Sequence, residues 1–280
     1  MNQEIFYTKK NIKDINIALL SDIHYHPKFN NKIFEKILKQ TKNSNVSYIT
    51  IVGDLIDSSD IKEFESLNSF LKELASIAPT IVILGNHEEK AGFIHHWHHY
   101  KNEKFLNMLK SIKNLYLLED STYNDKNITF YGFNTSYKYY NDDEESYESF
   151  CNEMNQIKPS LDRNKFNITL IHSPMNIYTY LEKNPENELN KSDLILSGHM
   201  HNGCLPLWIT KLINKTFKST RSLISPSRSL FPKFAQGRNY QKNGYIYQGL
   251  SKFSYSTKLF HIFDKLYSKN ITIITIKKDA

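Results

Sequence analysis

Short apolar runs that each end in polar residues recur along most of this chain. Residues 16–20, 48–52 and 80–84 are typical of buried strands, and residues 30–40 and 60–78 between them have the apolar spacing of amphipathic helices. This alternation of strand and helix predicts βαβ units around a largely parallel sheet, and therefore an α/β fold. Because ligand sites in such sheets lie beyond the carboxyl ends of the strands, we expect the polar strand ends to meet in one site.

Further periodic segments extend this pattern toward the C-terminus. We expect a helix over 103–113 and strands over 115–118, 128–133, 167–171, 193–197, 244–248 and 271–276. Asp60 and Glu63 have the spacing of a helix-capping pair, and the acidic interval 139–149 is predicted to be a solvated loop that leads into a helix. No linker-like segment divides the chain, so we predict a single domain over residues 1–280, with a less regular amphipathic segment at about 204–240.

Seven of the strand-end residues are of types that bind metal ions. They are Asp22, His24, Asp54, Asn86, His172, His199 and His201. A mixed set of carboxylate, amide and imidazole groups without thiolates argues against a structural zinc or iron–sulfur site, and it suits Mn²⁺, Fe or Zn²⁺. The set is large enough for two divalent ions, and the sequence leaves their identity open.

A second group of histidines occupies residues 95–99, which read His-His-Trp-His-His. These residues are predicted to lie in a loop or at the start of a helix, and no carboxylate accompanies them. We therefore interpret this segment as a rim loop or a packed cap rather than as a second metal site.

The strand-end motifs also form an ordered series. In chain order they are Asp-x-His from Asp22, Gly-Asp-x-x-Asp from Gly53, Gly-Asn-His-Glu from Gly85, the single His172, and Gly-His-x-His from Gly198. This series resembles that of the calcineurin-like metallophosphoesterases. The resemblance implies a four-layer α/β/β/α sandwich with a dinuclear metal centre.

The resemblance further implies a role for each residue. One ion would be held by Asp22, His24, Asp54 and His201, and the other by Asp54, Asn86, His172 and His199, so that Asp54 bridges the two. His87 would be the catalytic histidine that coordinates no metal. Asp57 matches the carboxylate that pairs with this histidine in some members of the family.

Such a centre suits the hydrolysis of phosphate esters. Two cations roughly 3.5 to 4 Å apart clamp the attacking and leaving oxygens and turn a bridging water into hydroxide near neutral pH. His87 is placed to protonate the departing alkoxide or to bind a phosphoryl oxygen, and Asp57 to hold the tautomer of His87. We predict a metal-dependent phosphoesterase that acts on a phosphodiester, a phosphomonoester or a pyrophosphate.

The charge of the chain bears on its partners. A formal net charge of +7 favours anionic partners, although lysines that only maintain solubility would give the same value. We expect a phosphorylated small-molecule or lipid-linked substrate. A nuclease or a cyclic-nucleotide phosphodiesterase is the alternative, but we find no DNA-binding motif and no regular alternation of basic and aromatic residues. A non-catalytic scaffold is a more distant third hypothesis, because such proteins lose ligands and the series here is complete.

Targeting features predict a cytoplasmic protein. No apolar run approaches the ~18 residues needed to span a bilayer, and the first residues lack the pattern of a secretion signal. Two cysteines, Cys151 and Cys204, are too few to stabilise a chain of 280 residues through disulfides, which favours a reducing compartment.

Contact with a membrane is a further hypothesis. The motif Gly198–Gly203, with residues 230–234 and 236–237, resembles the YkuE-like branch of the family, which acts at the membrane in some members. Asn202 stands where that branch commonly has glycine. Residues 205–218 and 257–269 are basic and amphipathic, so they either lie on the anionic inner face of the membrane or pack against the sheet.

Overall fold

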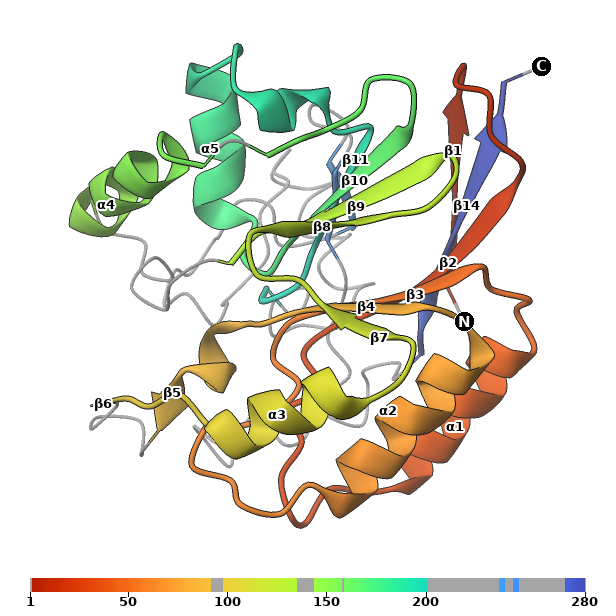
Figure 1. Ribbon diagram of the computed structural model, residues 1–280, viewed down its shortest axis with the longest axis vertical. Coiled ribbons are helices and arrows are strands. Elements are labelled where there is room, and N and C mark those ends of the chain that lie inside the picture. The colour runs from red at the N-terminus through yellow and green to blue at the C-terminus, as the bar shows by residue number, and fades with distance from the viewer. Residues whose placement is uncertain are drawn as a thin grey trace, which may run out of the picture.

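Two six-stranded β-sheets lie at the centre of the protein (Figure 1). The computed structural model describes residues 2–91, 98–134, 144–157, 159–200, 237–239, 244–246 and 270–279. Within these residues the first sheet has the strand order β1 (Asn2–Thr8), β14 (Thr272–Lys278), β2 (Ile15–Leu20), β3 (Tyr48–Val52), β4 (Thr80–Ile83) and β7 (Leu115–Leu117). Only the β14–β2 pair of this sheet is antiparallel.

The second sheet repeats this mainly parallel arrangement. Its strand order is β12 (Gly237–Asn239), β13 (Gly244–Ile246), β11 (Leu194–Ser197), β10 (Phe166–Ile171), β9 (Ile128–Gly132) and β8 (Ser121–Asn124). The outermost pair at each edge is antiparallel, and the inner pairs are parallel. A short hairpin of β5 (Lys90–Ala91) and β6 (His98–His99) stands apart from both sheets.

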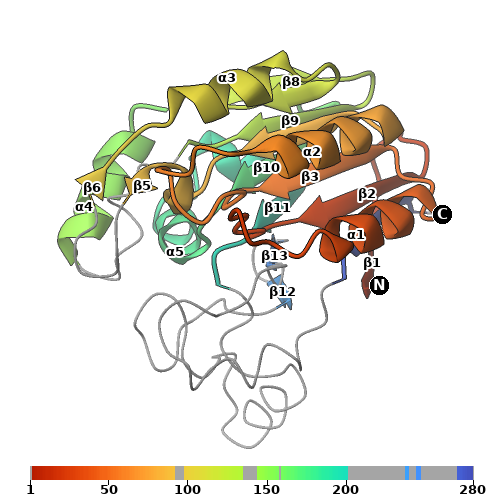
Figure 2. The same cartoon turned by 90° about the horizontal axis from the view of Figure 1, so that it is seen from below.

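Helices cover the outer face of each sheet, as Figures 1 and 2 show. The helices α1 (Lys32–Lys42), α2 (Glu65–Ile77) and α3 (Glu103–Ser111) lie on the first sheet, and α4 (Glu144–Met154) and α5 (Met175–Lys183) lie on the second. Two 3₁₀ helices, η1 (Asn86–Glu88) and η3 (Glu188–Lys191), complete the described elements. The predicted four-layer α/β/β/α sandwich is therefore confirmed.

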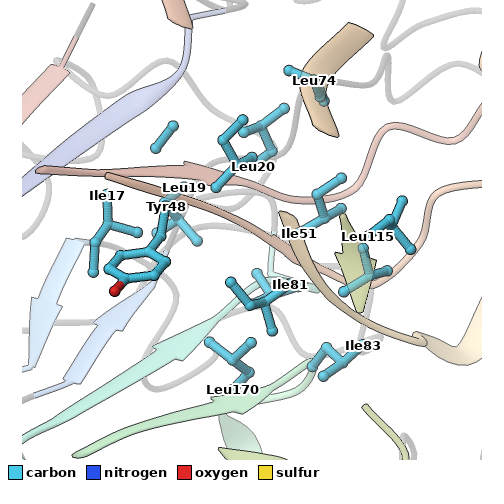
Figure 3. Close-up of a cluster of buried hydrophobic side chains, with 14 of the residues drawn as sticks. Ile17, Leu19, Leu20, Tyr48, Ile51, Leu74, Ile81, Ile83, Leu115 and Leu170 are labelled. Carbon is cyan, nitrogen blue, oxygen red and sulfur yellow. The ribbon is translucent and has the colours of Figure 1, made fainter. Parts of the chain in front are cut away.

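Aliphatic and aromatic side chains fill the space between the two sheets. Ile81 and Ile83 of β4 lie beside Leu170 of β10, while Leu20 lies near Leu74 of α2 on the other face of the first sheet (Figure 3). Each large aliphatic side chain that becomes fully buried contributes about 1.5–3 kcal/mol. This packing fixes the two sheets against each other, and with them the relative positions of their strand ends.

The start of α2 differs from the sequence prediction. The helix begins at Glu65 with Phe64 as N-cap and no side-chain cap, so the predicted capping pair of Asp60 and Glu63 is wrong. The reason is a tertiary contact: the side-chain amide of Asn102 donates hydrogen bonds to the carbonyl oxygens of Ser59 and Ile61, at 2.7 and 2.8 Å. These bonds hold the segment before α2 outside the helix.

Other elements follow the sequence prediction to different degrees. The strands β2, β3, β4, β7, β9, β10, β11, β13 and β14 lie within a few residues of the predicted ranges, whereas β1, β8 and α5 were not predicted. Residues 139–143 of the predicted acidic loop, and almost all of the amphipathic segments 204–240 and 257–269, lie outside the described residues, whereas residues 144–149 belong to α4. Among the helices that the structure describes, none combines the length and apolar character needed to cross a membrane. The single domain over residues 1–280 stays a prediction.

Candidate metal centre

The strands β2, β3 and β4 end side by side and place three of the predicted ligands. Leu20 pairs with Ile51, and Val52 pairs with Ile83, so the three strands finish in register. Asp22, Asp54 and Asn86 follow these ends by two or three residues. Backbone hydrogen bonds continue beyond the strands, from Asp22 N to Gly53 O at 3.1 Å and from His24 N to Asp54 O at 2.9 Å.

The backbone of the predicted ligands adopts an uncommon conformation. Asp22, His24, Asp54 and His199 have φ values of 50°, 46°, 51° and 66°, in the left-handed region that favours glycine. Asp, Asn and His tolerate this region better than other residues, and such conformations cluster at functional sites. Two residues at positions i and i+2 would point to the same side if the segment were extended; Asp22 and His24 are not extended, yet both side chains reach the same site.

The second sheet contributes two histidines to the same place. His172 follows β10 and His199 follows β11, and Gly198 N donates to His172 O at 2.9 Å. His199 N donates to both carboxylate oxygens of Asp22, at 3.0 and 3.1 Å. The Asp22 carboxylate therefore joins a strand end of the first sheet to a strand end of the second.

Asp54 is shared by two groups of candidate ligands. Asp22, His24 and Asp54 form one group, and Asp54, His172 and His199 form the other, with the ligand atoms of each group within 4.8 Å of one another. Asp54 Oδ2 lies 3.5 Å from His24 Nε2 and 3.1 Å from His172 Nε2. This division is the one that the family resemblance implies, as far as the described residues extend. Metal binding by these residues stays a prediction.

Contacts of the imidazole Nδ1 atoms orient both histidines. His172 Nδ1 lies 2.6 Å from the carbonyl oxygen of Val52, which can only accept, so Nδ1 carries a proton. His24 Nδ1 lies 3.4 Å from Asp57 Oδ1. Contacts of this kind fix the tautomer and ring orientation of metal-binding histidines, and here they direct both Nε2 atoms toward Asp54.

Asn86 supplies an independent indication of a cation. This side chain is 4% exposed, and its Oδ1 has no hydrogen-bond partner within the described part of the chain. A buried polar oxygen without a partner costs about 1–3 kcal/mol. An oxygen-binding divalent ion at this position would remove that cost, so the residues present fit the predicted metals.

The electrostatics of the site couple its acidic and basic groups. Burial alone would raise the pKa of Asp54, but the positive charges of His172 and His87 hold this pKa well below its usual value. Burial lowers the pKa of His172, whereas the charge of Asp54 and the hydrogen bond with it raise that pKa to about 9. For His24, burial is likewise outweighed by the hydrogen bond to Asp57 and by the charge of Asp54, and its pKa is about 9. The carboxylates and the imidazoles of the site thus stabilise each other's charged forms.

His87 and Asp57 lie next to the first group of ligands. The rings of His87 and His24 are 4.4 Å apart, and His87, His24 and Asp57 bring their ligand atoms within 4.8 Å of one another. His87 Nδ1 lies 2.5 Å from the main-chain oxygen of Asp57, whereas the Asp57 carboxylate lies 3.4 Å from His24 Nδ1. Burial lowers the pKa of His87 against the raising effect of Asp54. Asp57 therefore contacts His87 through its backbone and the predicted ligand His24 through its side chain.

Two predicted features lie partly or wholly outside the described residues. His201, the predicted fourth ligand of the first group, is one of them. Of the histidine-rich segment 95–99, only His98 and His99 are described; both are exposed on β6, and His99 Nε2 lies 3.9 Å from Glu89 Oε2. The interpretation of this segment as a rim loop or cap stays a prediction.

Sequence reasoning missed two side chains that support the site. Glu88 is 2% exposed, and its carboxylate accepts hydrogen bonds from the backbone N–H groups of Asp54, Ile56 and Gly85. Burial and the charge of Asp54 raise the pKa of Glu88 to about 7. The hydroxyl of Ser21 donates to Asp22 Oδ2. Glu88 is the last residue of the Gly-Asn-His-Glu motif and Ser21 directly precedes Asp22, and these positions are the signals that could have singled them out.

Glycine is required where the strand ends approach closely. A Cβ atom on Gly85 would lie 2.2 Å from Asp54 Oδ1 and 2.9 Å from His172 Nε2. A Cβ atom on Gly198 would lie 1.8 Å from Ser21 Oγ. The absence of a side chain at these two positions therefore lets the ligands of both sheets converge.

Comparison with known proteins identifies the family. Residues 15–203 match the family model of the calcineurin-like phosphoesterases. The chain belongs to the calcineurin-like phosphoesterase family. The predicted resemblance is thereby confirmed at the level of the family, and the family is metal-dependent, in line with the candidate metal-binding groups found here. Membership of the YkuE-like branch stays a prediction.

Individual relatives of this calcineurin-like phosphoesterase are distant. An uncharacterized metallophosphoesterase from Campylobacter jejuni is 28% identical over 193 residues, which cover 68% of this chain and 45% of that protein. One from Helicobacter pylori is 26% identical over 204 residues, covering 70% and 47%. The matched segments thus span about half the length of these curated relatives. Among solved structures, a purple acid phosphatase from yellow lupin matches with a TM-score of 0.39 and 14% identity, over 68% of this chain and 38% of its own.

Proposed function

We propose that this calcineurin-like phosphoesterase hydrolyses phosphate esters or pyrophosphates at a pair of divalent cations. The observation that carries the proposal is the position of Asp54, whose carboxylate belongs to both groups of candidate ligands. A carboxylate that belongs to both groups could hold two cations close together, at the roughly 3.5 to 4 Å separation of two-metal phosphoesterases. The names of the curated relatives, which are metallophosphoesterases, support the same activity.

The proposed reaction needs residues that hold the cations and a residue that transfers a proton. Asp22, His24 and, from the sequence alone, His201 would hold one ion, Asn86, His172 and His199 the other, and Asp54 both. When bound, divalent cations polarise phosphoryl oxygens and make water a nucleophile near neutral pH. His87 holds a proton at Nδ1 against the carbonyl oxygen of Asp57, so Nε2 is the atom that would exchange a proton with the leaving oxygen.

Two substitutions test the proposal in the purified full chain. Asp54→Ala should remove both metal binding and hydrolysis, because it deletes the shared ligand. His87→Ala should keep the metals and lower turnover by about 10²- to 10⁴-fold, the usual contribution of a proton-transfer residue. Asp14→Ala, at an exposed residue that precedes β2 and so lies at the opposite end of that strand from Asp22, is the matched control and should match the parent protein.

Metal content by mass spectrometry and hydrolysis of bis-p-nitrophenyl phosphate with added Mn²⁺ are the two readouts. Parental activity in Asp54→Ala would refute the proposal. The same assay with phosphomonoesters, cyclic nucleotides, single-stranded DNA and lipid pyrophosphates would identify the substrate class. The net charge of +7 supports an anionic substrate and is the observation that keeps the nuclease alternative in this panel.

We also propose a peripheral contact with anionic membrane, which would suit a lipid-linked substrate. The support is the basic amphipathic character of residues 205–218 and 257–269 in the sequence. Sedimentation with vesicles that contain anionic lipid should carry the protein down at low salt and release it at high salt. Protein that stays in the supernatant at low salt would exclude this contact.

A further inference from the structure

We propose that Glu88 is a positioning residue that holds the loops after β3 and β4 in the arrangement needed for metal binding. The proposal rests on the metal-dependent function proposed above. Glu88 is not one of the candidate ligands, since all of its described hydrogen bonds go to backbone amides. Its effect on the metals would therefore be indirect, through the loop that carries Asp54.

The Glu88 carboxylate joins two loops that carry predicted ligands. Oε2 accepts from Asp54 N at 3.0 Å and from Gly85 N, and Oε1 accepts from Ile56 N at 3.1 Å. Asp54 and Ile56 belong to the loop after β3, and Gly85 to the loop after β4. A single oxygen atom thus fixes the separation of the two loops at the residue that both groups of candidate ligands share.

A second hydrogen bond runs in the opposite direction between the same segments. His87 N donates to Asp54 Oδ1 at 3.0 Å, while Asp54 N donates to Glu88. The backbone of residue 54 is therefore held by the side chain of residue 88, and the side chain of residue 54 by the backbone of residue 87. This reciprocal pair fixes both the position and the orientation of the Asp54 carboxylate.

The backbone conformation explains why a side chain is needed here. Asp54 has a φ of 51°, which takes its N–H out of the strand ladder, and the three amides that donate to Glu88 belong to buried residues. Buried N–H groups left without an acceptor cost about 1–3 kcal/mol each. Without Glu88 the two loops would have to rearrange to find other acceptors, and the candidate ligands would move with them.

Three variants separate positioning from a purely structural role. Glu88→Asp keeps the charge but shortens the side chain by one methylene, so it cannot reach both loops. Glu88→Gln keeps the length, and its single oxygen can still accept from Asp54 and Gly85, but its NH₂ group would face the N–H of Ile56. The matched control is Asp193→Asn, because Asp193 also accepts from a backbone amide, Asn167 N at 2.7 Å, but precedes β11 and so lies at the opposite end of that strand from His199.

The experiment measures Mn²⁺ affinity by calorimetry, and thermal unfolding of the chelator-treated full chain. We expect Mn²⁺ binding to weaken about 10- to 100-fold in Glu88→Asp, the usual loss when a group that orients metal ligands is removed, and by a smaller factor in Glu88→Gln. Asp193→Asn should lower the unfolding temperature and leave Mn²⁺ affinity unchanged.

Two results would overturn the inference: parental Mn²⁺ affinity in Glu88→Asp, or an equal loss of affinity in Asp193→Asn. If Glu88→Asp does not fold, Glu88→Gln decides, since parental affinity in the folded Gln variant also overturns the inference. Failure of the proposed function would look different, because the parent protein itself would then bind no Mn²⁺. A parent that binds Mn²⁺ and hydrolyses phosphate esters, beside a Glu88→Asp variant that binds equally well, would refute the positioning role alone.

Discussion

The substitution Gly85→Ala would place a methyl group between the ligands of the two sheets. The added Cβ would lie 2.2 Å from Asp54 Oδ1, 2.5 Å from Asp54 N and 2.9 Å from His172 Nε2, where ordinary contacts begin at 3.4 Å. Asp54 would have to withdraw by about 1 Å, since two of its atoms are too close and one belongs to the backbone. The perturbation therefore acts directly on the carboxylate that both groups of candidate ligands share.

The expected magnitude has two parts. Overpacking a buried position costs about 1–3 kcal/mol, which corresponds to a fall of roughly 2 to 10 °C in unfolding temperature for a chain of this size. A displacement of a shared ligand by about 1 Å should weaken metal binding at least as much as the loss of an orienting group, about 10- to 100-fold. We expect both effects in Gly85→Ala, measured by differential scanning calorimetry and by Mn²⁺ titration.

Gly132→Ala is a control that overpacks the core without displacing a candidate metal ligand. Its added Cβ would lie 2.3 Å from Leu118 Cβ and 2.8 Å from Ile83 Cγ2, both apolar atoms of the core. We expect a similar fall in unfolding temperature with parental Mn²⁺ affinity. Folded Gly85→Ala protein that binds Mn²⁺ as tightly as the parent would show that the strand ends do not converge around a metal.

Three further predictions concern side chains that support the site or the fold. Asp57→Asn should weaken Mn²⁺ binding about tenfold in calorimetric titration, because the Asp57 carboxylate orients His24; unchanged affinity would count against that contact. Ser21→Ala removes the hydroxyl that donates to Asp22, and we expect a loss of about 1–2 kcal/mol in urea unfolding with a smaller effect on Mn²⁺ affinity; a stability equal to the parent would contradict this. Asn102→Ala should lower the free energy of unfolding by about 2–4 kcal/mol without changing Mn²⁺ affinity, since the Asn102 side chain makes three hydrogen bonds around the start of α3. Weaker Mn²⁺ binding in this variant would contradict the expectation that these bonds support the fold alone.

Local patterns in the sequence predicted much of the fold. The strands β2, β3, β4, β10 and β11 are apolar runs of four to six residues, and their ends are marked by residues such as Gly53 and Gly85. The spacing and composition of apolar residues predict such strands because a buried strand needs apolar side chains on both faces. The edge strand β1 was missed because it is defined by its partner: β1 pairs with β14, which comes from the other end of the chain.

In the candidate metal site, too, some features follow from the local sequence and others only from tertiary contacts. The sequence by itself determined which residue types stand at the strand ends, and the order of the motifs was enough to indicate the family, since ligand chemistry depends on side-chain identity. Only the tertiary structure decided that Asp22 binds the backbone of His199, that the Asp57 carboxylate faces His24, and that Glu88 joins two loops. These contacts link residues that are distant in the chain, and their geometry follows from the stacking of the two sheets and from left-handed backbone conformations that no local pattern reveals.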